Sequence, residues 1–378
     1  MNPLEKRICE RISAEGPITF ETFMDMALYE PGLGYYASEN IEIGRAGDFY
    51  TSQHVHPAFG IMIARQLEEM WDSMGRPAAF FAVEPGAGAA LMCRDILSYL
   101  TDKDLFRALT YVIVEANPAV RRKQEALLAG FSGKVAWRAS LHEVGKRIGC
   151  LLSNELLDAF PVHLVRMEDD LAEVYVDFDR HGSGENVRFV EVTRPPSTAA
   201  LSEYLSEFAP RLPKGYRTEI NLRIKDWLKS VSDVLDEGFV LTIDYGYPSR
   251  EYYDAERNRG TLLCYSGHRT EENPLVKVGR QDITAHVNFS AVKRWGELFG
   301  LKAIGFCRQG TYLVSLGIDR LIRELYERSP EYLFEVSRIK RLIFPGTLGD
   351  THKVIVQYKG KGNPQLRGFM VKNEIEKL

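Results

Sequence analysis

The 378-residue sequence has few cysteines and no paired cysteine motif. Its five cysteines are scattered singly along the chain, and none belongs to a CxxC pair. An odd number of isolated cysteines argues against a disulfide framework and indicates buried thiols in a reducing compartment. His54 and His56 alternate in "HVH", but two histidines without a third ligand do not make a zinc site, so no metal is expected.

The sequence also lacks an excess of positive charge and a long apolar run. Lys and Arg total 48 against 52 Asp and Glu, so the formal net charge is −4. A broad basic face is therefore not expected, which argues against a nucleic-acid binder. No run of eighteen apolar residues occurs, so no membrane span is expected. The acidic N-terminal segment has neither the apolar core of a signal peptide nor the composition of a transit peptide, which predicts a cytoplasmic location.

What the sequence does contain is an alternation of short apolar runs with helical patterns. Such alternation predicts βαβ units and a mostly parallel sheet with helices on both faces, which is an α/β fold. Between the fourth and fifth runs, alternating and helical segments predict an inserted α+β subdomain. The five candidate strands are Phe80–Glu84, Leu109–Glu115, Lys134–Trp137, Cys150–Asn154 and Phe239–Asp244.

A turn with two glycines follows the first candidate strand. In "FFAVEPGAGAALMCRDIL", Glu84 ends the strand, and Gly86 and Gly88 precede a helical pattern. Ligands of open α/β sheets bind at this edge, where glycines let the backbone approach a ligand and helix amides face it. The third glycine of the dinucleotide fingerprint is Leu91 here, which disfavours a dinucleotide oxidoreductase. The alternative interpretation is a tight turn that binds nothing.

The acid-x-Gly-x-Gly pattern resembles motif I of the class I S-adenosylmethionine-dependent methyltransferases. The resemblance implies that Glu84 lies near the cationic methionyl end of the cofactor, and the third motif glycine is Ala90 here. Glu115 ends the second strand and could accept both ribose hydroxyl protons, or else cap the following helix. Ser140 and Leu141, after the third strand, are expected to flank the adenine ring.

Separate segments along the chain resemble one family. They are "YEPGLGYYAS", "GDFYTS", "EPGAGAALMCRDIL", "VEANPAVRRKQ", "SNELLDAFPVHLV", "VLTIDYGYP", "GTLLCYSGHR" and "QDITAHVNF". In this order they are similar to the MidA/NDUFAF-type proteins, a bacterial and mitochondrial methyltransferase family tied in eukaryotes to the assembly of respiratory complex I. The resemblance implies a class I, Rossmann-like methyltransferase sheet and S-adenosyl-L-methionine as cofactor. The mitochondrial member is understood to dimethylate an arginine of a complex I subunit.

The segment "GDFYTS" precedes a departure from the family pattern. Asp48, Phe49 and Thr51 of "GDFYTS" are expected to close over the cofactor, or else to form a turn before the next helix. After this segment the family continues with Pro-Glu, whereas this chain has Gln53–His56, so the identity of the methyl acceptor stays open.

The resemblance and the patterns together divide the chain into three predicted parts. They are an N-terminal helical region with a cofactor-covering loop (1–75), a methyltransferase core (76–160 and 237–360) and an inserted substrate-side subdomain (161–236).

Polar residues after the fourth and fifth strands are the candidates for the chemistry. An arginine guanidinium stays protonated, and carboxylates that hydrogen-bond its fork orient it and stabilise developing charge. "SNELLDAFP" supplies Asn154, Glu155 and Asp158, whose acids point the same way if the segment is helical, although local capping is the alternative. Asp244 ends the fifth strand at the same rim. His286 is a candidate base with a pKa near neutrality, or else a structural hydrogen-bonding residue.

Three functions remain open from the sequence. The favoured one is an S-adenosylmethionine-dependent methyltransferase that acts on a protein arginine, with a complex I-type subunit as a candidate partner. A small-molecule O- or N-methyltransferase would instead need a base such as His286. A non-catalytic assembly or binding factor would keep the fold and bind a partner without cofactor. A homodimer is a further hypothesis.

Overall fold

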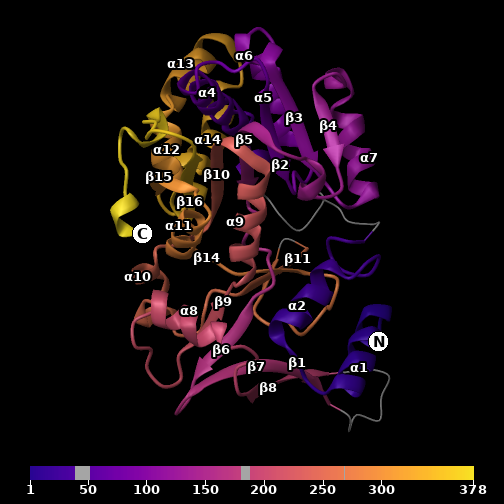
Figure 1. Cartoon of the computed structure of the whole chain (residues 1–378). Coiled ribbons are helices and arrows are strands. Elements are labelled where there is room, and N and C mark those ends of the chain that lie inside the picture. Colours follow the sequence, from indigo (N-terminus) through magenta and orange to yellow (C-terminus); the bar gives the residue numbers. More distant parts are fainter. Residues whose placement is uncertain (39–51, 180–187, 268) are drawn as a thin grey trace.

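An eight-stranded sheet forms the centre of the molecule. The computed structural model describes residues 1–38, 52–179, 188–267 and 269–378 (Figure 1). From one edge to the other, the strands are β15 (Lys302–Arg308), β16 (His352–Lys359), β10 (Leu235–Tyr247), β5 (Arg147–Asn154), β2 (Phe80–Pro85), β3 (Leu109–Val114) and β4 (Val135–Arg138), and β14 (Val287–Asn288) pairs with β10.

Five neighbouring strands of this sheet run parallel, and one strand is reversed. β10, β5, β2, β3 and β4 pair in parallel, whereas β16 is antiparallel to both β10 and β15. The five parallel strands are those expected from the sequence, so the predicted α/β fold with a mostly parallel sheet is confirmed. The order reverses between β2 and β5, because β3 and β4 continue on one side of β2 and β5 lies on the other.

Helices cover both faces of the central sheet. Side chains of β5 alternate between the faces: Cys150 and Leu152 join one buried cluster and Leu151 joins the other. The helices that follow the strands are α5 (Leu91–Leu100), α6 (Asp104–Ala108), α7 (Pro118–Leu127), α9 (Arg223–Val234), α10 (Ser249–Tyr252), α11 (Phe289–Leu298), α12 (Gln309–Ser315), α13 (Ile318–Arg328), α14 (Tyr332–Ile343) and α15 (Leu348–Thr351).

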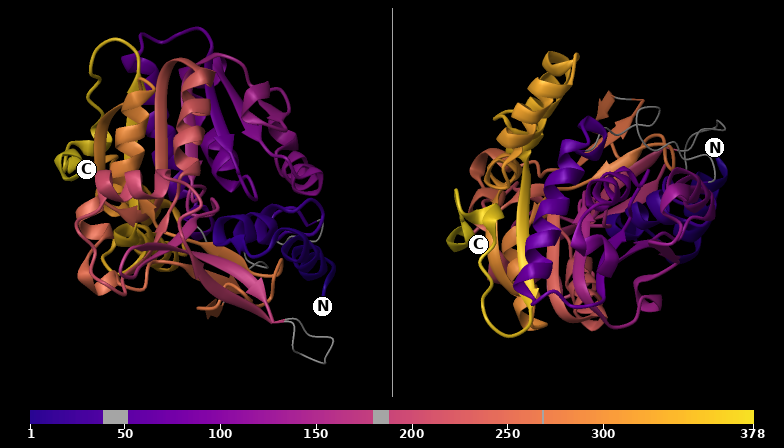
Figure 2. Two further views of the ribbon diagram at one scale, coloured as in Figure 1. Left: turned by 60° about the horizontal axis from the view of Figure 1, so that its bottom comes forward. Right: turned by 90° about the horizontal axis from the view of Figure 1, so that it is seen from above.

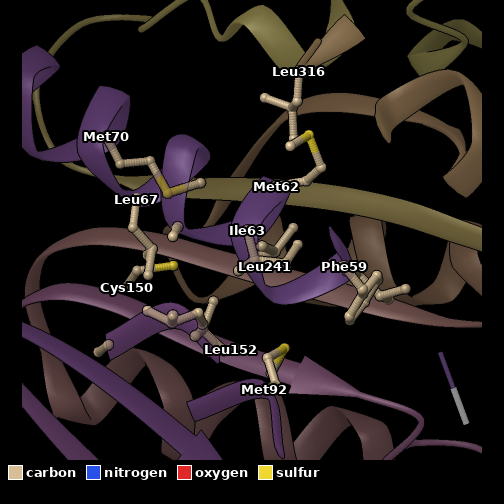
Figure 3. Packing of buried hydrophobic residues seen from close by; sticks show 14 of the residues in the cluster. Phe59, Met62, Ile63, Leu67, Met70, Met92, Cys150, Leu152, Leu241 and Leu316 are labelled. Atoms are coloured by element: carbon tan, nitrogen blue, oxygen red, sulfur yellow. The ribbon is translucent and has the colours of Figure 1, made fainter. Parts of the chain in front are cut away.

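Helix α4 (Ala58–Ser73) shows how sequence spacing produces this packing. Its buried side chains recur three or four residues apart, so they form one apolar stripe that lies on the sheet. The contacting residues are Phe59, Met62, Ile63, Leu67 and Met70 of α4, with Cys150, Leu152 and Leu241 of the sheet beneath them (Figure 3).

The N-terminal region and the insertion share a second sheet, below the central one in Figure 1. The short strand β1 pairs antiparallel with β7, with Ile18 opposite Val176. The N-terminal helices pack on these strands, as the indigo and magenta segments of Figure 2 (left) show. The elements are α1 (Pro3–Glu15), β1 (Ile18–Thr19), α2 (Phe20–Tyr29), β6 (His163–Met167), β7 (Leu171–Phe178), β8 (Phe189–Arg194), α8 (Ala200–Phe208) and β9 (Arg217–Ile220).

A third, small sheet extends this lower part of the molecule. Its strands are β12 (Arg269–Glu271), β11 (Leu263–Ser266) and β13 (Asp282–Thr284), and their buried residues belong to the cluster that also contains α1 and α2. Helix α4 packs with the central sheet instead, although the prediction grouped it with the N-terminal region. The three-part division of the chain stays a prediction.

The described part of the chain gives three findings on the cysteines, on a membrane span and on a metal site. All five cysteines are free, and four of them are buried. Among the described residues, no helix has the length and apolar character that a membrane crossing requires. The same residues contain no group of three or more His, Cys, Asp or Glu side chains placed to hold a metal ion.

Candidate active site

A cavity of about 770 Å³ lies at the carboxyl ends of β2, β3 and β5. This is the edge where the strand order reverses, and ligands of open α/β sheets bind at such a position. The opposite wall is an N-terminal segment, residues 29–38, which we call the strap, and its Tyr29 and Tyr36 line the cavity. The volume falls in the range of about 300–1,000 Å³ that small-molecule and cofactor sites occupy.

The glycine turn forms one wall of the cavity, as the sequence predicts. Gly86 and Gly88 line it and have φ angles of 65° and 55°, a left-handed conformation that favours glycine. A Cβ on Gly86 would lie 2.9 Å from Leu156 Cδ1, so a side chain there would require the Leu156 side chain to move. Ala90 is also left-handed, with φ of 56°, which costs an L-residue about 1–2 kcal/mol.

Glu115 lines the cavity beside the glycine turn. Its carboxylate accepts the Asn117 N–H at 2.7 Å, and burial raises the pKa of the carboxyl above its ordinary value. The cap of α7 is Asn117, which accepts the Ala119 N–H at 2.9 Å, so the alternative role of Glu115 as the helix cap is wrong. A carboxylate held here is placed to accept hydroxyl protons from a ligand in the cavity.

Three carboxylates and two tyrosines converge at the other end of the cavity. Asp158 and Asp282 are 3% and 1% exposed, and Glu155 lies beside them. The Tyr36 hydroxyl donates to Asp282 at 2.8 Å, and the Tyr29 and Tyr36 rings stack with centroids 5.6 Å apart. Burial, together with the neighbouring carboxylates, raises the pKa of Asp158 well above its usual range. This end is therefore electrostatically suited to a positively charged ligand group.

Glu155 is held in an unusual backbone conformation at this end. Its φ is 50°, and its N–H donates to the Ile243 carbonyl at 2.9 Å. The carboxylate accepts the Ser52 N–H at 3.1 Å and lies 3.3 Å from His352 Nε2. The helix considered for "SNELLDAFP" does not form, because β5 ends in a turn, but Asn154, Glu155 and Asp158 all line the cavity.

Asp244 lies behind the cavity wall and is not among the lining residues. It is fully buried and accepts the backbone N–H groups of Leu156 and Leu157 at 3.2 and 2.9 Å. Burial raises the pKa of its carboxyl to about 7. Its expected place at the rim beside the acceptor is therefore wrong, and it shapes the turn that carries Glu155 and Asp158.

His286 is not in the cavity, so its predicted role as a base is wrong. Its half-buried ring lies near the rings of Tyr245 and Tyr247, with centroids 6.2 and 5.4 Å away. Burial and nearby positive charges lower the pKa of the ring to about 4. A base must reach the proton it removes, and this side chain faces other protein groups.

Three residues expected at the cofactor do not line the cavity. Glu84 is buried beneath the glycine turn, where it accepts the Tyr111 hydroxyl at 2.5 Å, and burial raises the pKa of its carboxyl to about 7. Ser140 is half-buried and does not line the cavity, and Leu141 is buried where the short helix after β4 packs against α9. These placements correct the expected contacts with the methionyl end and the adenine ring.

The segment around residue 52 supports both ends of the cavity. Asp48, Phe49 and Thr51 lie outside the described residues. Gln53 to Val55, three of the four residues that depart from the family pattern, lie in helix α3 (Ser52–Val55). Gln53 lines the cavity and accepts the Met92 N–H at 3.2 Å, so it caps α5 where Ala90 has no side chain to do so.

Asp282, Tyr29 and His352 are site residues that were not predicted from the sequence. Asp282 and Tyr29 lie in quoted segments, "QDITAHVNF" and "YEPGLGYYAS", but nothing in those segments shows that they meet. His352 comes from β16, far from any motif. Long-range folding brings these side chains to the turn after β5.

The strand order with its one reversed strand, and the glycine turn at the switch point, define the class of this protein as a class I methyltransferase. The chain belongs to the family described as "Putative S-adenosyl-L-methionine-dependent methyltransferase", whose model matches residues 62–307. It is 30% identical to a structure from Burkholderia thailandensis bound to S-adenosyl-homocysteine, with a TM-score of 0.90 over 99% of this chain and 96% of that chain.

Curated relatives extend the comparison. The Drosophila melanogaster protein "Protein arginine methyltransferase NDUFAF7 homolog, mitochondrial" is 27% identical over 94% of this chain and 85% of the relative. The Homo sapiens "Protein arginine methyltransferase NDUFAF7, mitochondrial" is 26% identical over 88% and 77%. The predicted family, enzyme class and S-adenosyl-L-methionine cofactor are confirmed.

The predicted cytoplasmic location is contradicted, because these relatives are described as mitochondrial. The prediction rested on the acidic composition of the N-terminal segment. In the structure this segment is helix α1, which buries Leu4, Ile8 and Ile12 and uses Glu5 in a capping box with Asn2. Its composition therefore reflects the requirements of a packed, capped helix and carries no information about location.

Proposed function

We propose that this S-adenosylmethionine-dependent methyltransferase transfers the methyl group to a guanidinium nitrogen of an arginine side chain in a protein. The observation that carries the proposal is the end of the cavity where Glu155, Asp158 and Asp282 lie with Tyr29 and Tyr36. The names of the curated relatives, which are protein arginine methyltransferases, support the same acceptor.

The acidic end of the cavity favours a cationic acceptor over a neutral one. Among the described lining residues the only Lys or Arg is Arg122, which lies on α7 with the cofactor-side residues. Burial and the neighbouring carboxylates raise the pKa of Asp158, so a guanidinium that enters among these acids relieves their mutual repulsion. The tyrosine faces add attraction for a planar cation. A neutral hydroxyl acceptor would provide neither effect.

The residues of this chain would position the acceptor and receive its proton. When bound, S-adenosylmethionine supplies the methyl carbon, whose bond to sulfur breaks as its bond to nitrogen forms. Asp158 and Asp282 would each accept hydrogen bonds from the guanidinium fork, which fixes its orientation. Glu155, fixed by the Ser52 N–H, would stabilise the positive charge. Because burial raises its pKa, Asp158 is suited to take up the proton that the methylated nitrogen loses.

The cofactor would occupy the glycine end of the same cavity. Gly86 and Gly88 keep that wall free of side chains, and Glu115 would accept the hydrogen bonds of the ribose hydroxyls. Val120 of α7 also lines the cavity and offers an apolar surface suited to a base or ribose face. These assignments use only residues that line the cavity.

For the acceptor protein we propose a complex I-type subunit, on the family resemblance described above. A homodimer likewise stays a prediction. Sedimentation equilibrium of the purified protein tests the homodimer, and a methylation assay on isolated complex I subunits tests the acceptor.

The proposed acceptor is tested with labelled S-adenosylmethionine and peptides that contain a single arginine. We expect label on the arginine peptide and none on matched peptides that carry lysine or citrulline, since lysine lacks the fork and citrulline lacks the charge. Asp282→Asn should remove most of the labelling, whereas Asp169→Asn, at an exposed acid, should leave it unchanged. Labelling of citrulline equal to that of arginine would refute the cationic acceptor.

A further inference from the structure

Asn117 joins the cofactor end of the cavity to the strap that forms the acceptor end. Its backbone N–H donates to the Glu115 carboxylate at 2.7 Å. Its side-chain Nδ2 donates to the carbonyl groups of Tyr36 and Ser38, at 3.0 and 3.1 Å. Its Oδ1 accepts the Ala119 N–H and so caps α7. Asn117 therefore contacts the strap, helix α7 and Glu115, which is the residue proposed to bind the ribose.

The strap is attached to the acceptor end by the hydroxyl groups of Tyr29 and Tyr36. The Tyr29 hydroxyl donates to the Ala159 carbonyl at 2.8 Å, next to Asp158. The Tyr36 hydroxyl donates to Asp282 at 2.8 Å. Tyr36 thus has its carbonyl bonded to Asn117 and its hydroxyl bonded to an acid of the acceptor end. Any change in the position of Asn117 reaches Asp282 through a single residue.

We propose that Asn117 is a positioning residue that couples the two ends of the cavity, so that cofactor binding at Glu115 orders the strap and thereby strengthens acceptor binding. A ligand that hydrogen-bonds Glu115 fixes the carboxylate that holds the Asn117 backbone. The fixed Asn117 amide then holds the strap carbonyls, and the tyrosines of the strap complete the wall around the acceptor. Two sites linked in this way raise each other's affinity by the same factor.

The inference rests on the proposed function only for the identity of the acceptor. The link between Glu115, Asn117 and the strap stands on the hydrogen bonds themselves. The second ligand is taken as a guanidinium because of the acids that Tyr36 reaches. The experiment therefore needs one measurement that uses the cofactor product alone and another that adds an arginine compound.

Asn117→Ser separates the coupling from the helix cap. Serine is as good an N-cap as asparagine, so α7 keeps its cap while the two donors to the strap are removed. Asn288→Ser is the matched control, because Asn288 caps α11 in the same way and its Nδ2 donates to Tyr204, away from the cavity. Thermal melting of both variants shows whether they fold.

The first measurement is hydrogen exchange of residues 29–38 with and without S-adenosyl-homocysteine. We expect the ligand to protect these residues in the unchanged protein and in Asn288→Ser, and to leave them unprotected in Asn117→Ser. Calorimetry should show an affinity for S-adenosyl-homocysteine about tenfold weaker in Asn117→Ser, the effect of two lost hydrogen bonds. Equal protection and equal affinity in the two variants would overturn the role of Asn117.

The second measurement adds N-acetyl-arginine amide as a probe. S-adenosyl-homocysteine should tighten binding of the probe about five- to tenfold in the unchanged protein and less than twofold in Asn117→Ser. If the probe binds neither protein, the proposed acceptor is wrong, while the exchange measurement still decides the role of Asn117. If Asn117→Ser fails to fold, Asn117→Asp, which keeps the Oδ cap and also lacks the donors, replaces it.

Discussion

The two ends of one cavity are built in different ways. The cofactor end consists of backbone and a few side chains from two consecutive strand ends, with Gly86, Gly88 and Glu115 all between residues 86 and 115. The acceptor end is assembled from α2, the turn after β5 and β13, so that Tyr29, Asp158 and Asp282 come from three distant parts of the chain. Short-range structure builds the first end, and tertiary packing builds the second.

The ends also differ in their electrostatics. Glycine φ angles and backbone N–H groups dominate the first, where Glu115 is the carboxylate that faces the ligand. Buried carboxylates dominate the second, where burial and the neighbouring acids raise the pKa of Asp158. Substitutions at one end should therefore alter one ligand and leave the other nearly unaffected, except where Asn117 and Tyr36 connect them.

The largest effect is expected from Asp158→Asn at the acceptor end. The amide cannot take up a proton or a full share of the guanidinium charge, and a lost charged hydrogen bond costs about 3 kcal/mol. We expect kcat/KM for an arginine peptide to fall about 100-fold, while the affinity for S-adenosyl-homocysteine changes less than twofold. Steady-state kinetics and calorimetry on the same preparation measure both. A comparable loss of cofactor affinity would mean that the two ends are not separable.

A smaller effect, on the other ligand, is expected from Glu115→Gln at the cofactor end. The neutral amide accepts weaker hydrogen bonds from ribose hydroxyls and from the Asn117 N–H, so the affinity for S-adenosyl-homocysteine should fall about 10- to 30-fold. Glu125→Gln, at an exposed acid on the same helix as Val120, is the control and should change nothing. Calorimetry at constant pH decides, and an unchanged affinity would remove Glu115 from the proposed ribose site.

The same difference between the ends explains what the sequence could predict. The glycine turn and Glu115 were found because a strand end, two glycines and an acid follow one another within a local pattern. Asp282 could not be found in this way, since its place beside Asp158 depends on how the small third sheet packs against the turn after β5.

The errors have physical causes of the same kind. Glu84 and Asp244 sit at strand ends, as expected, but in a parallel sheet alternate side chains face the two covering layers instead of the rim. Both are buried hydrogen-bonding residues: Glu84 accepts the Tyr111 hydroxyl of β3, and Asp244 accepts a backbone N–H of the turn after β5. His286 was chosen for its ordinary pKa, and burial changed that pKa along with its access to the cavity.

A modest effect, mainly at the acceptor end, is expected from Tyr36→Phe. The substitution removes the hydroxyl that donates to Asp282 and keeps the ring that stacks on Tyr29. Loss of one hydrogen bond to a carboxylate should lower kcat/KM for an arginine peptide about five- to tenfold, with a change in cofactor affinity of twofold or less. Tyr326→Phe, at an exposed tyrosine, serves as the control. If turnover is unchanged, Asp282 does not depend on the strap for its position.

The smallest effect on either ligand is expected from Glu84→Gln, although this variant should change the stability of the fold. Burial raises the pKa of Glu84 to about 7, so the folded protein keeps a proton that the unfolded chain releases near pH 4.5. The contribution of this group to the free energy of unfolding is therefore full below that pH and is lost as the pH rises toward 7, which amounts to about 2–3 kcal/mol. Glutamine cannot titrate, so the difference in unfolding free energy between the two proteins should shift in favour of Glu84→Gln across this window.

Urea unfolding at several pH values measures the shift, and calorimetry should find cofactor affinity within twofold of the unchanged protein. A large loss of that affinity would place Glu84 on the ligand side of the glycine turn. It would also contradict the assumption that only cavity-lining residues make up the cofactor end.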